Sequence, residues 1–364
     1  MNTDALTNRR NFLKAMAVTG AGLALGRNLP AMQDAARPGH TTRLGFDNFS
    51  VRAMKWNARQ LIDYAASLKL DSLFLTDLDV YESFDESYLR DVKKRADDNG
   101  LVIYAGSWSI CPTSKFFKNK WGTAEEHLAL GIRVAKALQS PVFRCILGMG
   151  EDRASTGGIE ARMADTIKVC RSARSQALDA GVKIAIENHA GDMQAWEIAG
   201  LCEEAGKEYV GVTFDTGNST WTMEDPKEAL EILAPYVAAS ALRDSMIWTT
   251  PNGAAIQWTA MGEGVIDYKA FVPRFIELCP KVPVNVEIIS GFTRDMPYLR
   301  KNYWDVWPKA RAKDFAKFEA LTRLGKMIPQ RHFADAKDEQ DYQKSELERS
   351  LAYCKETLGL GLKG

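Results

Sequence analysis

Eight apolar segments, each followed by a stretch with helical periodicity, run through the middle of the chain. They cover residues 43–51, 71–77, 101–108, 141–148, 182–189, 209–218, 237–245 and 282–290. Most are continuous apolar runs, which is the pattern of parallel strands covered on both faces. Parallel strands need a crossover between them, and the helical stretches supply it. Eight such units in roughly 250 residues predict an α/β fold, a (β/α)8 TIM barrel.

An open, doubly wound sheet is the alternative architecture for alternating strands and helices. Its first strand normally leads into a glycine-rich turn that binds phosphate. The segment "GFDNFSV", residues 45–51, contains no such turn. The barrel is therefore the better interpretation.

Several residues mark where the predicted helices begin and end. Thr123 and Glu126 form a capping box, and Gly181 is expected to end the helix that precedes the fifth strand. Pro226 suits the first turn of a helix, and Asp267 suits an N-cap. These signals fall between the apolar segments and support the same eight-unit interpretation.

The pattern changes beyond Ser290, where aromatic and basic residues become frequent. Near the end, Leu347, Leu351, Cys354 and Leu358 share one helical face. This part predicts a closing eighth helix and a C-terminal helical extension, which packs on the barrel or on another subunit of a homo-oligomer. The expected organisation is a signal and linker over 1–40, a barrel over 41–290 and the extension over 291–364.

The N-terminus carries Arg9 and Arg10 ahead of a mild apolar run over residues 15–25. The run is too short to span a bilayer and is typical of a secretion signal. The arginine pair resembles the twin-arginine signal, which implies that the twin-arginine machinery exports the folded protein to the periplasm. No stable membrane anchor is expected after processing. The alternative is a chance Arg-Arg pair before a hydrophobic helix.

The formal net charge is zero, which gives no electrostatic basis for binding nucleic acid or an anionic membrane. The six cysteines are far apart and form no C-x-x-C pattern, so buried free thiols are expected rather than disulfides or a zinc ribbon.

Polar side chains gather at the ends of the later strands. The fifth strand ends in Glu187, Asn188 and His189; the sixth in Asp215 with Asn218; the seventh in Arg243 and Asp244; the eighth in Glu287. In a barrel these ends converge on one site. Three carboxylates in an apolar mouth need a cation, and oxygen ligands favour Mn, Mg or Co over Zn. Alternatively, each acid is a helix N-cap or pairs with a nearby arginine or lysine.

The motifs "AIENH", "TFDTGN", "GEGVID" and "VNVEI", in this order, resemble the xylose-isomerase-like barrels over about residues 42–290. The closest likeness is to the sugar isomerase/epimerase branch, which includes ketose 3-epimerases and inosose-processing enzymes. The resemblance implies that Glu187, Asp215 and Glu287 hold one divalent metal. It also implies that Glu187 and Glu287 act as base and acid in proton exchange through an enediolate.

The chain departs from the family where a histidine ligand is expected. The family often has H-L-K-D at the seventh strand, and this chain has "ALRD", with Ala241 in the ligand position. Gln257, Asp244 or water remain as fourth ligand. We choose Gln257 because it lies on the connection after the seventh strand and its amide oxygen suits a hard cation. Alternatively, Gln257 is a residue of a surface loop and binds no metal.

Five further residues are predicted to bind the substrate: His189, Asn218, Arg144, Arg243 and Trp108. His189 alone among the four histidines ends a strand, although it can also be structural. The two arginines bind substrate oxygens or only balance the acids. Trp108 stacks on a sugar ring or packs under a lid.

The predicted function is a metal-dependent isomerase or epimerase of a non-phosphorylated sugar or keto-sugar, a small-molecule carbohydrate. Two alternatives stay open. A leaving group next to the carbanion would make the protein a 3-keto-glycoside lyase or hydrolase, and loss of catalysis would leave an exported sugar-binding barrel. The endonuclease branch needs a histidine-rich site and a basic surface, which four histidines and zero net charge do not supply.

Overall fold

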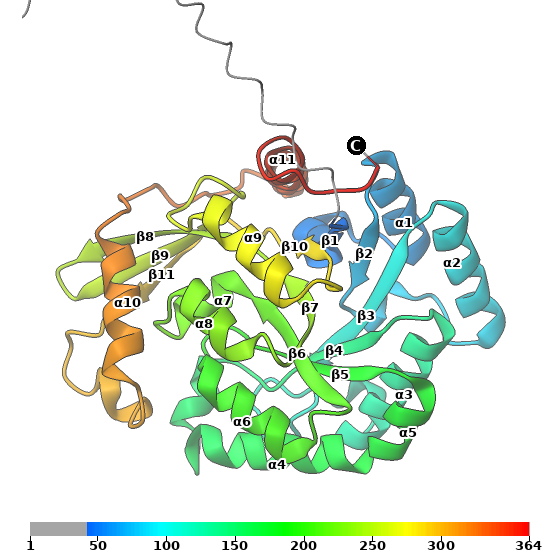
Figure 1. Cartoon of the computed structure of the whole chain (residues 1–364), viewed down its shortest axis with the longest axis horizontal. Helices are drawn as coiled ribbons and strands as arrows, with labels where there is room; N and C mark the ends of the chain where they lie inside the picture. Colours follow the sequence, from blue (N-terminus) through cyan, green and yellow to red (C-terminus); the bar gives the residue numbers. More distant parts are fainter. Residues whose placement is uncertain (1–41, 364) are drawn as a thin grey trace, which may run out of the picture. The chain divides into compact units, whose positions relative to one another are not determined.

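Eight parallel strands form a barrel in the computed structural model, which describes residues 42–363 (Figure 1). The strands are β1 (Leu44–Asp47), β2 (Ser72–Leu75), β3 (Val102–Ser109), β4 (Val142–Ile146), β5 (Lys183–Glu187), β6 (Val210–Asp215), β7 (Val237–Ala241) and β10 (Val284–Val286). Each pairs with its neighbour in chain order, and β10 pairs with β1. A parallel bridge between Leu242 and Val286 brings the two ends of the sheet together. The predicted (β/α)8 fold is confirmed.

Helices follow the strands and lie outside them (Figure 1). The α-helices are α1 (Ala58–Ser67), α2 (Glu86–Asp98), α3 (Ala124–Ala137), α4 (Gly158–Ser172), α5 (Arg174–Ala180), α6 (Ala195–Ala205), α7 (Thr216–Trp221), α8 (Pro226–Leu233), α9 (Tyr268–Leu278), α10 (Ala312–Thr322) and α11 (Ala336–Glu356). Short 3-10 helices are η1 (Asn48–Met54), η2 (Leu78–Val80), η3 (Asn119–Trp121), η4 (Gly150–Ala154) and η5 (Tyr303–Val306).

The predicted helix signals lie where expected. Thr123 and Glu126 form the capping box of α3, and Pro226 occupies the first turn of α8. Gly181 ends α5 in the left-handed conformation, and the Asp267 side chain accepts a hydrogen bond from the α9 backbone. The single long helix expected before Gly181 is two helices, because the chain leaves helical geometry for one residue at Ala173.

A second, antiparallel sheet was not predicted. It consists of β8 (Asp244–Thr250), β9 (Gly253–Thr259) and β11 (Thr293–Met296). The predicted seventh strand, 237–245, is therefore divided: β7 ends at Ala241, and β8 begins in the other sheet at Asp244. Arg243 lies at this junction. Helix α10 lies beside the second sheet (Figure 1), which has its own apolar core around Ile247, Ile256 and Phe318.

The C-terminal helix α11 packs beside η1 and β10, so the predicted closing helix is present (Figure 1). Leu347, Leu351 and Cys354 on its predicted apolar face are buried. Leu324 and Met327, which follow α10, remain exposed. Packing of the extension on a second subunit stays a prediction.

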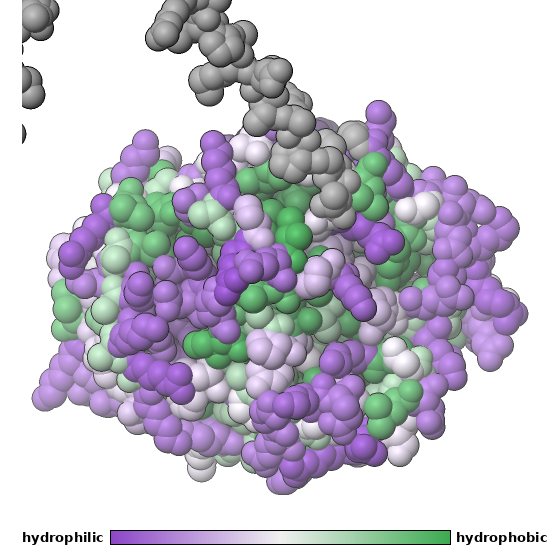
Figure 2. Space-filling view, in the orientation of Figure 1, coloured by the Kyte–Doolittle hydropathy of each residue, from purple (hydrophilic) through white to green (hydrophobic). Residues whose placement is uncertain are grey.

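The face drawn in Figure 2 carries mainly hydrophilic residues, with apolar residues in scattered areas. All six cysteines lie within residues 42–363 and are buried and free, as predicted. No helix in the described part of the chain is both long and apolar enough to span a bilayer. The predicted export signal, including Arg9 and Arg10, lies outside the described residues.

Candidate active site

Three buried carboxylates meet at the C-terminal end of the barrel. Glu187 is the last residue of β5, Asp215 is the last of β6, and Glu287 follows β10. One oxygen atom from each lies within 4.8 Å of the others. The strand ends thus bring together the three acids that the sequence analysis grouped.

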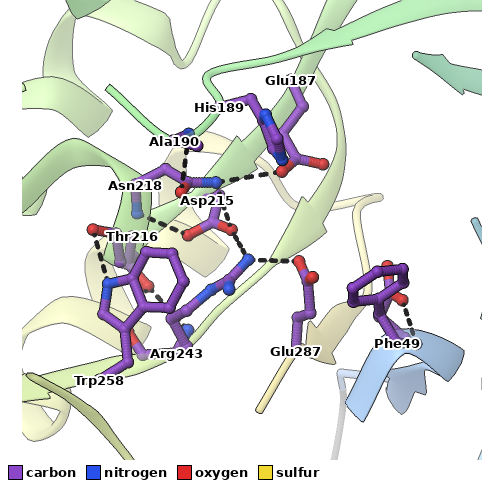
Figure 3. Close-up of polar contacts among 12 residues, drawn as sticks. Phe49, Glu187, His189, Ala190, Asp215, Thr216, Asn218, Arg243, Trp258 and Glu287 are labelled. Atoms are coloured by element: carbon purple, nitrogen blue, oxygen red, sulfur yellow. Dashed lines mark hydrogen bonds and ion pairs between the residues drawn. The ribbon is translucent and has the colours of Figure 1, made fainter. Parts of the chain in front are cut away.

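Two asparagines fix the positions of Glu187 and Asp215. The Asn188 side chain accepts from the Asp215 backbone N–H at 2.9 Å and donates to the Asp215 carbonyl at 2.8 Å. The Asn218 amide donates to Glu187 Oε1 at 3.1 Å and to Asp215 Oδ2 at 2.8 Å (Figure 3). Asp215 also caps α7 by accepting from the Asn218 backbone N–H. The motifs "IENH" and "DTGN" therefore build one rigid corner of the site.

Arg243 occupies the space between two of the carboxylates. Its Nη2 donates to Asp215 Oδ2 and to Glu287 Oε2 (Figure 3). The side chain is 2% exposed, and its guanidinium lies 4.2 Å from the ring centre of Trp258. The sequence analysis left open whether Arg243 binds substrate or balances the acids, and in this structure it balances Asp215 and Glu287.

Arg144 pairs with the third carboxylate. It projects from β4, donates from Nε to Glu187 Oε2, and donates from Nη1 to the Ser107 carbonyl at 2.9 Å. Both side chains of the ion pair are almost completely buried. The three carboxylates are therefore paired with two guanidinium groups, Glu187 with Arg144 and the other two with Arg243.

The surroundings move the pKa values of the glutamates in opposite directions. Burial alone would raise the pKa of Glu187, but the charges of Arg144 and Arg243 hold it below its ordinary value. Burial and the charge of Glu187 raise the pKa of Glu287, although Arg243 opposes this. The two carboxyl groups therefore differ in proton affinity within one site, which is the pattern of a base paired with an acid.

His189 presents one ring nitrogen to the cavity beside the trio. Its Nδ1 lies 2.8 Å from the Gly148 carbonyl, which can only accept, so Nδ1 carries the proton and Nε2 carries the lone pair. Burial lowers the pKa of His189 to about 4, so the ring is neutral at pH 7. Trp108 meets its ring edge-to-face at 5.6 Å and donates to the Phe116 carbonyl at 2.8 Å.

A cavity of about 520 Å³ adjoins these groups, a size within the usual range for small-molecule sites. Its lining combines charged residues of the site with many aromatic rings: Phe49, Trp108, Trp121, Trp221, Trp258 and Phe292. All five predicted substrate-binding residues line this cavity. Aromatic faces beside fixed polar groups suit a ligand with both C–H and hydroxyl surfaces, such as a sugar.

Gln257 does not join the carboxylates. Its Oε1 accepts from Thr293 at 2.9 Å and its Nε2 donates to the Pro329 carbonyl at 3.3 Å. Neighbouring side chains in a strand point to opposite faces, and in β9 it is Trp258 that faces Arg243. The sequence analysis treated this stretch as a connection and so did not apply the alternation that identifies Trp258.

Asp244, the other protein residue considered as fourth ligand, has a different role in this structure. Its carboxylate accepts from the backbone N–H groups of Gly262 and Gly264 at 3.0 Å, and also from Ser245 and Ile266. Burial raises its pKa to about 7. It holds the loop that follows β9.

The sequence analysis also missed a contact between Ser107 and His127. Ser107 Oγ and His127 Nε2 lie 2.7 Å apart, and both residues line the cavity. His127 comes from α3 rather than from a strand end, so the rule that singled out His189 passed over it. Burial lowers the pKa of His127 to about 4.

The acids are of the right type and close enough together to hold a metal ion. The arrangement nevertheless does not fit one as it stands, because Arg243 Nη2 already binds both Asp215 and Glu287. Ala241, at the family's histidine position, offers no ligand atom. A metal would have to displace the guanidinium from a buried position.

Two family descriptions match this chain. "Xylose isomerase-like TIM barrel" matches residues 62–292, and "TAT (twin-arginine translocation) pathway signal sequence" matches residues 7–26. The chain belongs to the xylose isomerase-like TIM barrel family. The signal match confirms the predicted resemblance and points to export by the twin-arginine pathway.

Known proteins resemble this chain at low sequence identity. The uncharacterized protein YihM of Escherichia coli (strain K12) is 29% identical over 98 residues, which are 27% of this chain and only 30% of that protein. The structure of D-psicose 3-epimerase with D-fructose has a TM-score of 0.56 at 15% identity, covering 88% of this chain and 100% of that one. The 3-keto-D-glucoside 4-epimerase YcjR of E. coli has a TM-score of 0.52 at 10% identity, covering 73% and 98%. These structural similarities establish the architecture.

Proposed function

We propose that the protein is an isomerase or epimerase of a carbonyl-bearing sugar and acts by proton transfer next to the carbonyl. One observation carries the proposal: the buried Glu287 lines a cavity of sugar-binding character beside the guanidinium of Arg243, and a carboxylate oxygen of the buried Glu187 lies within 4.8 Å of one from Glu287. Membership of the family supports it, as does the similarity to proteins named as sugar epimerases.

Proton transfer at such a carbon needs a base and a positive group near the carbonyl oxygen. Glu187, with its lowered pKa, is the base that takes the C–H proton. The C–H electron pair then forms the C=C bond of an enediolate, and the carbonyl oxygen becomes negative. Glu287, with its raised pKa, returns a proton to carbon, so that no electron leaves the substrate.

The other lining residues orient the sugar. The neutral Nε2 of His189 accepts a hydrogen bond from a substrate hydroxyl, and Trp108 offers an aromatic wall for the ring. Asn218 holds Glu187 and Asp215 in register rather than reaching outward, since its amide nitrogen is shared between them. Its role is therefore mainly to position the base.

A divalent metal held by Glu187, Asp215 and Glu287 is the alternative source of positive charge. The sequence predicts Mn, Mg or Co before Zn, and the family resemblance implies the same site. The prediction requires Arg243 to leave Asp215 and Glu287, and Gln257 to turn away from Thr293 and Pro329 if it is to serve as the fourth ligand.

Export limits the class of sugar that the protein meets. The twin-arginine signal supports a periplasmic location for the mature protein. Cells keep sugar phosphates inside, so a non-phosphorylated sugar or keto-sugar is the proposed substrate. A keto-glycoside belongs to the same chemical class.

The test is solvent deuterium uptake, followed by NMR, with the mature protein in D₂O and a panel of ketohexoses and 3-keto-glycosides. We expect deuterium at the carbon next to the carbonyl of at least one substrate. Glu187→Gln and Glu287→Gln should slow uptake by roughly 100-fold or more, the usual effect of losing a general acid or base. Glu224→Gln is the matched control and should keep the rate, because Glu224 is a buried acid that belongs neither to the trio of carboxylates nor to the cavity lining.

The same NMR spectra, together with tryptophan fluorescence, distinguish the proposed isomerase or epimerase from the alternative functions. Release of the aglycone from a 3-keto-glycoside would assign a lyase or hydrolase. Sugar-induced quenching of tryptophan fluorescence without any deuterium uptake would leave a sugar-binding barrel. Absence of both uptake and quenching across the panel contradicts the proposal.

A further inference from the structure

The geometry points to Arg243 as the permanent cation of this site: we infer that its guanidinium takes the place of the divalent metal and excludes it. The contacts of Arg243 alone support its place in the site. The catalytic consequence, that the reaction needs no metal, rests on the function proposed above.

The first support is the position of the guanidinium. A single nitrogen, Nη2, binds both Asp215 and Glu287, two of the three acids that a metal would use (Figure 3). The third acid, Glu187, is paired with Arg144. Each carboxylate of the trio therefore has a positively charged partner in the protein.

The second support is that the surrounding residues leave a channel shaped for this side chain. A Cβ atom on residue 217 would lie 2.3 Å from Arg243 Cγ and 2.5 Å from its Cδ. Real Cβ atoms do not approach other atoms so closely, and Cγ and Cδ are near the backbone and cannot easily move aside. Gly217 therefore provides the space through which Arg243 reaches the acids.

The third support is the cover over the guanidinium. Trp258 lies over it, donates from Nε1 to the Gly217 carbonyl at 3.1 Å, and stacks on Trp221 with ring centres 4.0 Å apart. Arginine is the side chain best suited to stacking on an indole while binding carboxylates through its edge. Gly217, Trp221 and Trp258 come from α7 and β9, so two separate elements hold the arginine in place.

The last residue of β7, at the family's histidine position, also lacks an atom that could bind a metal. Ala241 is completely buried and has no ligand atom. Arg243, two residues later, supplies a positive charge itself, whereas the family's histidine supplies a ligand for a metal cation. In the reaction, its hydrogen-bonding edge would stabilise the negative oxygen of the enediolate, a role that a fixed donor can perform without Lewis-acid chemistry.

The proposal predicts that the mature full-length chain takes up no divalent metal. The experiment is equilibrium dialysis against Mn²⁺, Mg²⁺, Co²⁺ or Zn²⁺, followed by elemental mass spectrometry and by melting curves with and without metal. Arg243→Ala should bind about one metal per chain, because it frees Asp215 and Glu287, two carboxylates of the type that hard cations prefer, next to Glu187. Its Tm should rise when Mn²⁺ is added, whereas the wild-type Tm should not.

Matched variants distinguish a specific effect from damage to the fold. Gly217→Ala keeps the arginine but blocks its channel, so it should gain metal as well. Arg243→Lys keeps a charge near the acids and should still exclude metal. Arg274→Ala removes an arginine from exposed ion pairs with Glu231 and Glu277 and should behave as wild type.

Deuterium uptake gives the catalytic readout. Wild-type uptake should be unaffected by EDTA, and Arg243→Ala should lose roughly 100-fold or more of it, the usual cost of removing a donor to a developing oxyanion. A stoichiometric metal in the wild type overturns the inference, and so does failure of both Arg243→Ala and Gly217→Ala to gain metal. If no sugar exchanges deuterium, the proposed function fails while the metal measurement still decides the inference.

Discussion

The pair formed by Arg144 and Glu187 provides a quantitative test of how the site is balanced. Replacing Arg144 by Met keeps most of the side-chain volume but leaves the Glu187 carboxylate without its cation. The two side chains are 5% and 1% exposed, so solvent cannot replace the lost partner. Asn218 still donates to Glu187 at 3.1 Å, which limits the damage.

The size of the effect follows from the burial of the pair. Unit charges about 4 Å apart attract by about 4 kcal/mol at an effective dielectric constant near 20, and removing one partner of a buried pair costs roughly 3–5 kcal/mol. With an unfolding entropy of about 2.1 cal/mol/K per residue over about 320 folded residues, this corresponds to a fall in Tm of about 5–7 °C.

The loss of stability in Arg144→Met should depend on pH. In the wild type Arg144 holds the pKa of Glu187 below its unfolded value, so the pair contributes stability above that value and loses it as the pH falls. In Arg144→Met burial raises the pKa instead, so the buried carboxylate becomes more unfavourable as the pH rises. The difference in Tm between the two proteins should therefore be larger at pH 8 than at pH 5.

The assay is a double-mutant cycle by calorimetry at pH 5 and pH 8, with Arg144→Met, Glu187→Gln and the double variant. The double variant should recover most of the loss at pH 8, because it removes both charges. A single Arg144→Met variant that melts within about 1 °C of wild type, or a double variant as unstable as the sum of the single ones, would refute the pairing.

Three further predictions concern residues in the site and in its surroundings. Burial raises the pKa of Glu224 to about 8, so the folded state keeps a proton that the unfolded state loses, and stability should fall by up to about 1.4 kcal/mol per pH unit between pH 5 and pH 8. Glu224→Gln should flatten this slope in a series of melting curves, and an unchanged slope would contradict the assignment. Asp192→Ala removes the carboxylate that accepts from the backbone N–H of His189 at 2.9 Å and should lower both Tm and deuterium uptake. Asp192→Asn retains an acceptor oxygen and should restore part of both, whereas equal loss in the two variants would exclude this positioning role. Trp258→Leu removes the cover over the guanidinium and should cost about 2–4 kcal/mol, measured by urea unfolding, while a change below about 0.5 kcal/mol would show that the stacking is not structural.

The sequence was sufficient for the barrel because its pattern is regular. Each strand is an apolar run, and helix signals such as Thr123 and Pro226 fall in the gaps. The convergence of Glu187, Asp215 and Glu287 then followed from topology, since parallel strands end at one rim.

The second sheet escaped prediction for a physical reason. Residues 244–250 continue from the seventh strand without a clear break, and the change of sheet occurs within Leu242 and Arg243. No glycine or proline marks the junction. The direction of the Arg243 side chain depends on this change of sheet, and so does the alternation in β9 that turns Trp258 rather than Gln257 toward it.

A cluster of acids in an apolar mouth predicts a cation, but it does not predict which one. With all three carboxyl groups ionised, one divalent ion by itself would leave a net charge of −1, and Arg144 and Arg243 together leave the same −1. The number of acids in the sequence therefore does not show whether their charge is balanced by a metal or by arginines. Three uncharged residues favour the arginine over a metal. Gly217 leaves the space through which Arg243 reaches the acids, and the indole of Trp258 covers its guanidinium. Ala241 has no atom that could bind a metal. The sequence alone does not show that Gly217 and Trp258 lie against the arginine.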